Sequence, residues 1–211
     1  GAHLGYNDGP VFCDVDGDGA PDLFARLVGN ATGAFVGMRL YRNLGDGTLV
    51  DGGDPTSGLD MASWISPAFG TTVRWSYAPE RTFSADLDGD GDLDFITGGQ
   101  PNPSVPGLTL ASATWTNLGN GTFAPGSFLP NFEPMTVADV TGDGLPDMIG
   151  HYSSTGSIYG LFDAMVRNVA GSFAAPLSGD LFPTPTTSLV VGRAFAVDVD
   201  ADGDLDVVRN A

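Results

Sequence analysis

The sequence predicts an all-β protein built from repeated small antiparallel sheets, and three observations support this prediction. Gly contributes 31 and Pro 15 of the 211 residues, so turns are frequent and long helices are disfavoured. Short apolar runs alternate with segments rich in Gly and Asp, which is typical of strands. Two motifs also recur in a fixed order along the chain, which indicates a repeat architecture.

The first motif is a nine-residue acidic segment that occurs four times. Its copies begin at Asp14, Asp86, Asp139 and Asp198, and each reads Asp-x-(Asp/Thr)-x-Asp-Gly-x-x-Asp. Short apolar runs flank the copies, such as residues 11–13 before the first one. Each acidic segment is therefore expected to connect the first two strands of its repeat.

The second motif follows the first three acidic segments and contains Asn43, Asn117 or Asn168. Its Gly-Asp-Gly, Gly-Asn-Gly or Ala-Gly core supplies the positive-φ positions of a tight hairpin. Each repeat is therefore expected to run strand, acidic loop, strand, strand, tight turn, strand. A four-stranded antiparallel sheet of this kind is what a β-propeller blade requires.

The predicted organisation is a single repeat domain over residues 1–211, with units at approximately 9–80, 81–133, 134–192 and 193–211. This organisation gives three full blades and a partial fourth. Closed propellers usually need at least about four blades, and an unfinished sheet exposes an unpaired edge. We therefore expect this edge to meet a neighbouring subunit or a further segment by strand addition.

The charge of the chain limits its partners. Only 8 Lys and Arg residues oppose 26 Asp and Glu residues, which gives a formal net charge of -18. A nucleic-acid partner is not expected, because phosphate binding requires a basic surface. No apolar run is long enough to predict a membrane-spanning helix.

The acidic segments have the composition of calcium-binding loops. Carboxylates at positions 1, 3 and 5 can converge on one point, while Gly at position 6 permits the turn that returns position 9. The side chain at position 7 varies, which indicates that its carbonyl is the ligand. Hard oxygen ligands in this number favour Ca²⁺, and up to four ions are expected. The expected metal ligands are Asp14, Asp16, Asp18, Ala20, Asp22, Asp86, Asp88, Asp90, Asp92, Asp94, Asp139, Thr141, Asp143, Leu145, Asp147, Asp198, Asp200, Asp202, Asp204 and Asp206.

Electrostatics favour metal binding by these loops over ordinary solvated turns. The loops contain 17 of the 26 acidic residues, and two carboxylates about 5 Å apart repel by roughly 3 kcal/mol. Four divalent ions would raise the formal charge from -18 to about -10. The third loop is expected to be the weakest site, because Thr141 replaces a charged ligand. An EF-hand is disfavoured, since position 12 is never Glu and strand-like residues flank each loop.

These features resemble the VCBS and FG-GAP-like repeat family, whose calcium loops are shared with the β-propeller of integrin alpha chains. The resemblance rests on the four acidic loops and the three turn motifs, which together cover most of the chain. It implies β-propeller blades, calcium between the first two strands of a blade, and roles in extracellular adhesion, ligand binding or assembly. Millimolar calcium saturates modest sites, so an extracellular or cell-surface location is expected.

The longest insertion, between the first turn motif and the second acidic loop, carries candidate ligand-binding side chains. Its aromatic rings and guanidinium groups suit stacking on a carbohydrate or a protein ligand. The alternative is that its tryptophans cover a blade edge or fill the gap between blades. The candidate residues are Trp64, Arg74, Trp75, Tyr77 and Arg81.

Other motifs give weaker indications. Asn30 and Asn120 match the N-glycosylation pattern, although a turn role explains Asn120 without a sugar. His3 and His151 are isolated in the sequence, and no nucleophile elbow, phosphate loop or dinucleotide fingerprint is present. The sequence therefore predicts a non-enzymatic binding, adhesion or assembly module. Two alternatives remain: a subunit of a secreted filament or surface layer completed by neighbouring copies, and a polysaccharide-active enzyme on a propeller scaffold.

Overall fold

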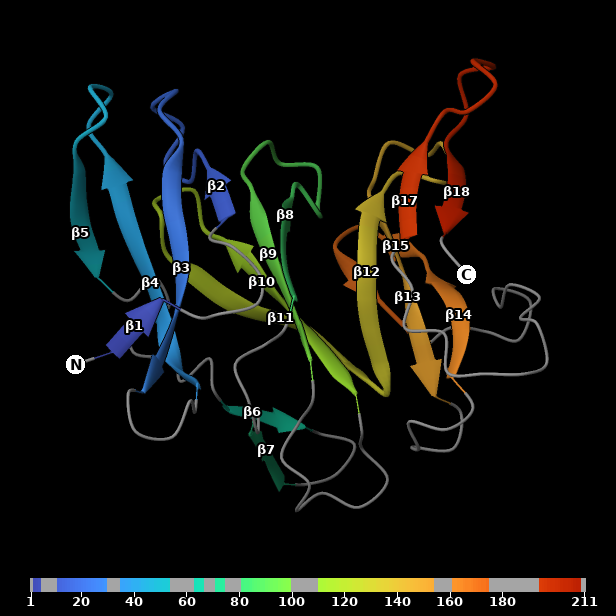
Figure 1. Ribbon diagram of the computed structural model, residues 1–211, viewed down its shortest axis with the longest axis horizontal. Coiled ribbons are helices and arrows are strands. Elements are labelled where there is room, and N and C mark those ends of the chain that lie inside the picture. Colours follow the sequence, from blue (N-terminus) through green and yellow to red (C-terminus); the bar gives the residue numbers. More distant parts are fainter. Residues whose placement is uncertain are drawn as a thin grey trace.

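The computed structural model describes residues 2–4, 11–29, 35–53, 63–66, 71–74, 81–99, 110–153, 161–174 and 194–209. All regular structure in these residues is β-strand and every strand pair is antiparallel, which confirms the all-β prediction. None of the described segments is a helix that is long and apolar enough to cross a membrane. The sheets follow one another in chain order across Figure 1, from β5 on the left to β18 on the right.

The first sheet forms around β3 (Asp22–Gly29). Both β1 (Ala2–Leu4) and β2 (Val11–Cys13) pair with β3, and the sheet continues through β4 (Phe35–Asn43) and β5 (Leu49–Gly53). The first acidic loop joins β2 to β3, and the first turn motif joins β4 to β5. This repeat therefore has the predicted strand order with β1 as an added fifth strand.

The second sheet has the four strands predicted for a repeat. It consists of β8 (Arg81–Ala85), β9 (Asp94–Gly99), β10 (Ala111–Asn117) and β11 (Phe123–Pro130), paired in chain order. The second acidic loop joins β8 to β9, and the second turn motif joins β10 to β11.

The third repeat departs from four continuous strands. Its sheet contains β12 (Phe132–Ala138), β13 (Asp147–Ser153) and β14 (Leu161–Val166), while β15 (Asn168–Val169) and β16 (Ser172–Phe173) form a separate short pair. The third turn motif is shorter than the other two, and Ala170 takes a positive φ of 50° where the others use glycine. The shortened turn leaves only two residues on each side to pair.

Two further hairpins complete the described structure. In the fourth repeat, β17 (Ala194–Val197) pairs with β18 (Asp206–Arg209) around the fourth acidic loop. In the insertion, β6 (Ser63–Ser66) pairs with β7 (Thr71–Arg74), and this hairpin lies at the bottom of Figure 1, away from the acidic loops.

The apolar core lies between successive sheets. Phe24 of the first repeat stacks on Phe95 of the second, with ring centroids 3.7 Å apart, and Phe123 packs against both rings. Two more clusters join Leu87 and Ile96 to Met148 and Val166, and Ile149 to Val207. Fully burying one such side chain contributes about 1.5–3 kcal/mol. Each sheet therefore depends on its neighbours for stability, as in other repeat proteins.

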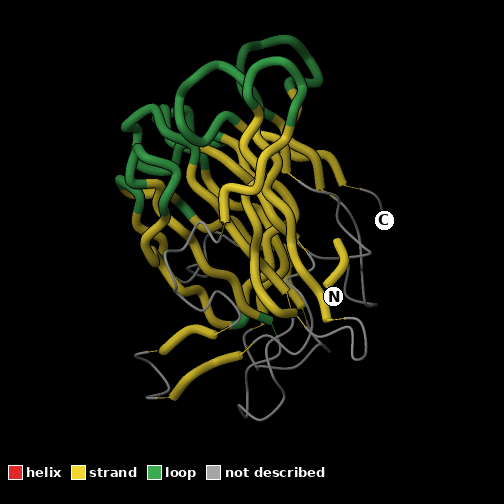
Figure 2. The backbone as a smooth tube through the Cα atoms, turned by 90° about the vertical axis from the view of Figure 1, so that its left-hand side faces the viewer, coloured by secondary structure: helices red, strands yellow, loops and turns green. Residues whose placement is uncertain are grey.

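The loops that carry the acidic motif and the turn motif gather at one end of the strands, where they are drawn green in Figure 2. This arrangement follows from the antiparallel order, because each loop or turn joins strands at the same end of its sheet. The chemistry-bearing residues of successive repeats are thereby brought next to one another.

Candidate metal centres

The first carboxylate of each loop is bound by amides of its own loop. Asp14 Oδ1 accepts hydrogen bonds from the backbone N–H groups of Gly17 (2.8 Å) and Asp18 (3.1 Å), and Oδ2 accepts one from Gly19 (2.7 Å). All three bonds form to Asp139, two of them form to Asp86, and one forms to Asp198. Position 1 therefore holds the loop in a tight turn.

The residues at positions 4 and 6 of each loop lie in the left-handed backbone region, and their φ angles differ. At position 4, φ lies between 62° for Ala201 and 81° for Gly89, whereas at position 6 it lies between 87° for Gly19 and 98° for Gly203. L residues occur in this region mainly near a φ of about 57°. This difference explains why position 4 accepts alanine while position 6 is glycine in all four loops.

Carboxylate oxygens converge at three of the loops. Asp14, Asp16 and Asp18 each offer an oxygen within 4.8 Å of the other two. The second and fourth loops offer the sets Asp86, Asp88, Asp90 and Asp198, Asp200, Asp206. Burial and the neighbouring Asp90 raise the pKa of Asp88 above its ordinary value. Such like-charged groups are stabilised by a cation between them.

The donor set fits a hard divalent cation. Asp16 Oδ1 and Asp198 Oδ1 are buried oxygens that accept no hydrogen bond within the described structure. A buried polar atom left in this state costs about 1–3 kcal/mol. Carboxylate and carbonyl oxygens are the ligands that Ca²⁺ takes, and each loop offers several of them in a short flexible turn.

The third loop offers fewer charges. Thr141 stands where the other loops have aspartate, and no triad of carboxylates forms there among the described residues. The backbone N–H of Thr141 instead donates to Asp147 Oδ2 at 3.2 Å.

Positions 5 and 7 form a second small turn. The backbone N–H at position 7 donates to the carboxylate at position 5 in every loop, for example from Ala20 to Asp18 Oδ1 at 2.8 Å. The other donors are Asp92, Leu145 and Asp204, with acceptors Asp90, Asp143 and Asp202. The contact at position 7 thus involves the backbone, which explains why its side chain varies.

The aspartate at position 9 is hydrogen-bonded and, unlike the carboxylates of the triad, buried in the first three loops. In the first three loops it is at most 1% exposed. Asp94 Oδ2 accepts the N–H of Leu87 at 2.8 Å, and Oδ1 accepts the N–H of Asn117 at 2.7 Å. Asp22 and Asp147 make the equivalent bonds to their own loop and turn. Burial raises the pKa of Asp94 to about 6, and this effect outweighs that of the two hydrogen bonds, which lower the pKa.

The two oxygens of this buried aspartate connect the acidic loop to the turn motif of the same repeat. Each oxygen keeps a second lone pair, so the carboxylate can still contribute to a metal. Asp206 of the fourth loop differs, because it is exposed and its oxygen belongs to the triad.

The turn asparagine links successive repeats. Asn117 Nδ2 donates to the carbonyl of Val15 (3.0 Å), in the preceding acidic loop, and to that of Leu93 (3.3 Å). Asn168 Nδ2 repeats this pattern toward Leu87 (2.7 Å) and its own loop. The turn motif alone predicts these asparagines only as turn formers, so their role between repeats was missed. The available signal was their nearly constant distance of 21, 23 and 21 residues from position 9.

The candidate ligand-binding residues are distributed differently from the acidic loops. Trp64 lies in β6 and Arg74 in β7, on the two paired strands of the separate hairpin. Trp75 and Tyr77 lie outside the described residues. Arg81 begins β8, and its Nε is 3.6 Å from Glu133 Oε1 of the third repeat. Arg81 therefore takes part in an ion pair between repeats.

The two candidate glycosylation sites also differ. Asn30 lies outside the described residues, whereas Asn120 lies in the second turn. Asn120 Oδ1 accepts hydrogen bonds from the backbone N–H (3.0 Å) and the hydroxyl (2.5 Å) of Thr122. These contacts give Asn120 a role in shaping the turn.

A buried charged cluster was not anticipated from the sequence, which treated His151 as isolated. His151 Nδ1 lies 3.2 Å from Asp163 Oδ1 on β14, and Glu133 is opposite His151 on β12. The three residues are at most 8% exposed, and Arg81 pairs with Glu133 from the second repeat. These residues come together through the strand register, which the sequence alone does not give.

Comparison with known proteins supports the resemblance inferred above. The FG-GAP-like repeat family matches residues 14–97 and 86–150, which together form more than half of the chain. The two matches begin at Asp14 and Asp86, the first residues of the first two acidic loops. No curated protein matches the sequence. The chain therefore belongs to the FG-GAP-like repeat family.

Proposed function

We propose that this protein is a calcium-stabilised, β-propeller-type module that serves binding, adhesion or assembly outside the cell. The observation that carries the proposal is the recurrence of one loop geometry, with converging carboxylates at three loops and a bonded position 9 in all four. Membership of the FG-GAP-like repeat family supports the same function. A structural role for calcium fits these sites best, because they join strands and lie beside the contacts between repeats.

The ligands would be the side chains at positions 1, 3, 5 and 9 of each loop and the carbonyl at position 7. A bound cation supplies positive charge that offsets the repulsion among the carboxylates. Position 9 is bonded to the turn, so a metal that fixes the loop also fixes the turn that reaches the neighbouring repeat. Calcium would thus stabilise the interface between repeats.

We propose an extracellular location because loops of this kind in extracellular modules bind calcium weakly. Extracellular modules bind calcium with dissociation constants of about 10⁻⁴–10⁻³ M, and only extracellular calcium saturates sites of this kind. FG-GAP-like repeats are also typical of extracellular proteins.

Calorimetry and thermal unfolding test the proposed calcium binding. We expect millimolar calcium to raise the melting temperature relative to EDTA, because ligand at ten times its Kd stabilises a site by about 1.4 kcal/mol. Magnesium at the same concentration should raise it less, since Mg²⁺ requires shorter, near-ideal octahedral bonds and gives up its water ligands reluctantly. Equal melting temperatures in calcium and EDTA, together with no heat of binding, would refute the proposal.

For a ligand surface, we propose the β6–β7 hairpin. It lies at the end of the sheets away from the acidic loops, and its sequence places the aromatic residue Trp64 on β6 as the candidate for stacking on a ligand. The test is binding to arrays of glycans and peptides by the wild type and by Trp64→Ala. Loss of the binding signal at an unchanged melting temperature would support the surface, and retention of the signal would exclude Trp64 from it.

A second candidate function, assembly with neighbouring copies, is favoured by the exposed face of the fourth repeat. Val199 and Val208 are 64% and 43% exposed, whereas Val15 and Phe24 at the equivalent positions of the first repeat are 1% exposed. In the first repeat these positions pack against the next sheet. The fourth repeat therefore presents a face that suits another repeat of the same kind, from a further segment of the chain or, in this second candidate function, from a neighbouring molecule.

Sedimentation velocity over a range of protein concentrations tests this second candidate. Val208→Asp should abolish concentration-dependent association, while a matched change at exposed Val169, outside this face, should leave it intact. A monomer at every concentration would rule the assembly function out.

The geometry gives less support to a polysaccharide-active enzyme. The cluster at His151 is buried, with His151 itself 4% exposed, and it joins strands of one sheet. This placement favours a structural role for the cluster.

A further inference from the structure

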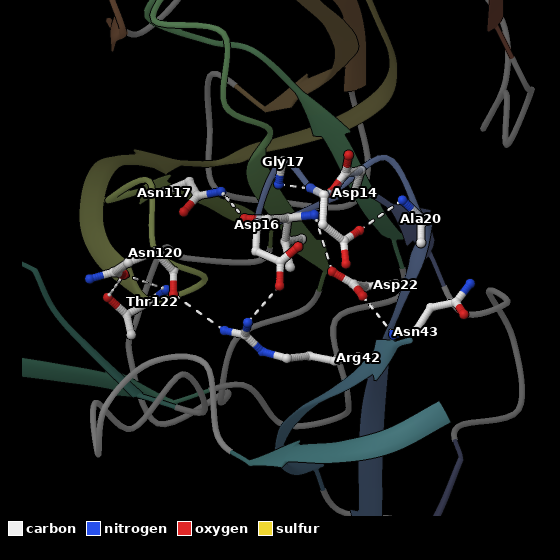
Figure 3. Close-up of polar contacts among 12 residues, drawn as sticks. Asp14, Asp16, Gly17, Ala20, Asp22, Arg42, Asn43, Asn117, Asn120 and Thr122 are labelled. Atoms are coloured by element: carbon white, nitrogen blue, oxygen red, sulfur yellow. Dashed lines mark hydrogen bonds and ion pairs between the residues drawn. The ribbon is translucent and has the colours of Figure 1, made fainter. Parts of the chain in front are cut away.

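The first acidic loop differs from the others in one contact, made by Arg42. Arg42 lies at the end of β4, one residue before the turn asparagine. Its Nη1 is 2.5 Å from Asp16 Oδ2, and its Nη2 donates to the backbone carbonyl of Asn120 at 3.3 Å (Figure 3). One guanidinium group therefore joins the first acidic loop to the turn of the second repeat.

The surroundings of Arg42 make this contact specific. The side chains of Arg42 and Asp16 are 35% and 21% exposed, so water screens their charges less than it screens those of a fully exposed pair. A Cβ atom at Gly121 would collide with Arg42 Nη2. Gly121 also takes a φ of 74°, so the turn requires glycine here and the guanidinium group lies against it.

Only the first repeat combines an arginine before the turn asparagine with an aspartate at position 3. The second repeat has Asp88 at position 3 but the short, neutral Thr116 at the arginine position. The third repeat has Arg167 at the arginine position but Thr141 at position 3. The contact between Arg42 and Asp16 is therefore a property of the first loop and not of the repeat.

Asp16 is also one of the three carboxylates that converge in the first loop. Its Oδ2 binds Arg42, whereas its buried Oδ1 accepts no hydrogen bond within the described structure. The guanidinium group of Arg42 is attracted to the negative charge of Asp16, and so is a cation that binds in the loop. Each therefore weakens the binding of the other.

We propose that Arg42 is an internal counter-ion that sets the calcium affinity of the first loop below that of the second. In calcium-free solution Arg42 neutralises Asp16 and keeps the first loop attached to the second repeat. Calcium binding at this loop then competes with the contact between Arg42 and Asp16. The inference rests on the proposed calcium binding and adds an order to it, in which the second loop fills before the first.

A reciprocal exchange of residues tests the inference. Arg42→Thr copies the second repeat into the first, and Thr116→Arg does the reverse. Amide NMR signals of Gly19 and Gly91, at position 6 of the two loops, report calcium titration of each loop separately. We expect Arg42→Thr to tighten binding at the first loop about tenfold, and Thr116→Arg to weaken binding at the second by a similar factor.

Arg39→Thr is the matched control, because Arg39 lies on the same strand and pairs with Asp51 away from the loop. This variant should leave both titrations unchanged. Melting temperatures in EDTA give a second readout, in which Arg42→Thr lowers stability and Thr116→Arg does not.

The outcomes separate the two proposals. If Gly19 titrates at an unchanged or higher calcium concentration in Arg42→Thr, the counter-ion role of Arg42 is wrong while calcium binding stands. If neither glycine responds to calcium in any variant, the proposed calcium binding fails and the inference fails with it.

Discussion

Replacing Asn117 with alanine removes three hydrogen bonds, one of which ties the second repeat to the first. The Asn117 side chain donates to the carbonyls of Val15 and Leu93, and its Oδ1 accepts the N–H of Gly119 at 3.1 Å. Asn117 is 2% exposed and Val15 is 1% exposed, so water does not readily replace the lost partner. At about 1 kcal/mol for each net hydrogen bond, the loss of unfolding free energy is about 3 kcal/mol.

Asn43→Ala supplies the matched control within the same chain. Asn43 also makes three side-chain hydrogen bonds, to Pro21, Gly45 and Gly47, but these are solvent-exposed and reach no other repeat. Water can replace exposed partners, so the expected loss is about 1 kcal/mol. The difference between the two variants isolates the contribution of burial and of the bond between repeats.

The assay is equilibrium urea unfolding followed by tryptophan fluorescence and far-ultraviolet circular dichroism, in calcium and in EDTA. Both variants keep the backbone N–H that donates to position 9, so the loop contact itself is unchanged. A loss for Asn117→Ala no larger than that for Asn43→Ala would refute the view that this asparagine links the repeats. Asn117→Asp should be still more destabilising, because it places a charged acceptor against the Val15 carbonyl.

Three further predictions follow from the loops and the buried cluster. In calcium-free buffer, the free energy of unfolding should fall as pH rises from about 4 to 6. The reason is that Asp94, with a pKa of about 6 in the folded protein, retains a proton that the unfolded chain has lost. Urea unfolding at several pH values should show a flatter slope for Asp94→Asn. In thermal unfolding, Gly19→Ala should lower the free energy of unfolding by about 1 kcal/mol more than Gly17→Ala does. Both sites have open space for a methyl group, but the φ of 87° at Gly19 lies further from the region that alanine tolerates than the φ of 73° at Gly17. Asp163→Ala should cost about 1–3 kcal/mol in urea unfolding because it removes the carboxylate oxygen that lies 3.2 Å from Nδ1 of buried His151, and a loss below about 1 kcal/mol would show that the pair contributes little.

The sequence was sufficient to predict the local features of each repeat. The acidic motif and the turn motif predict strands on either side, because Gly and Asp end apolar runs and supply the required backbone angles. Single residues within these motifs decide the local structure, as Gly19 does through its φ of 87°. The third repeat keeps the predicted order of strands, but its last two described strands, Asn168–Val169 and Ser172–Phe173, form a separate short pair.

Contacts between repeats were not predictable in the same way. Asn117 and Val15 are 102 residues apart, and Arg42 and Asn120 are 78 residues apart. Such contacts depend on how one sheet packs on the next, and local propensity carries no information about that packing. The pairing of His151 with Asp163 depends likewise on strand register, which a single residue of slip would abolish.

The hydrogen bonds between loops and turns form one continuous series across the first three repeats. The series runs through Asp22, Val15, Asn117, Asp94, Leu87, Asn168 and Asp147 in that order. In these repeats each position 9 binds both its own loop and its own turn, and the second and third turns each bind the preceding loop. When one loop is ordered, the backbone carbonyl that accepts the hydrogen bond of the next turn is held in place. The stability of each repeat therefore depends on its nearest neighbours. A cation at the second loop should for this reason protect the amides of the first and third turns from hydrogen exchange, although neither turn contains a ligand of that cation.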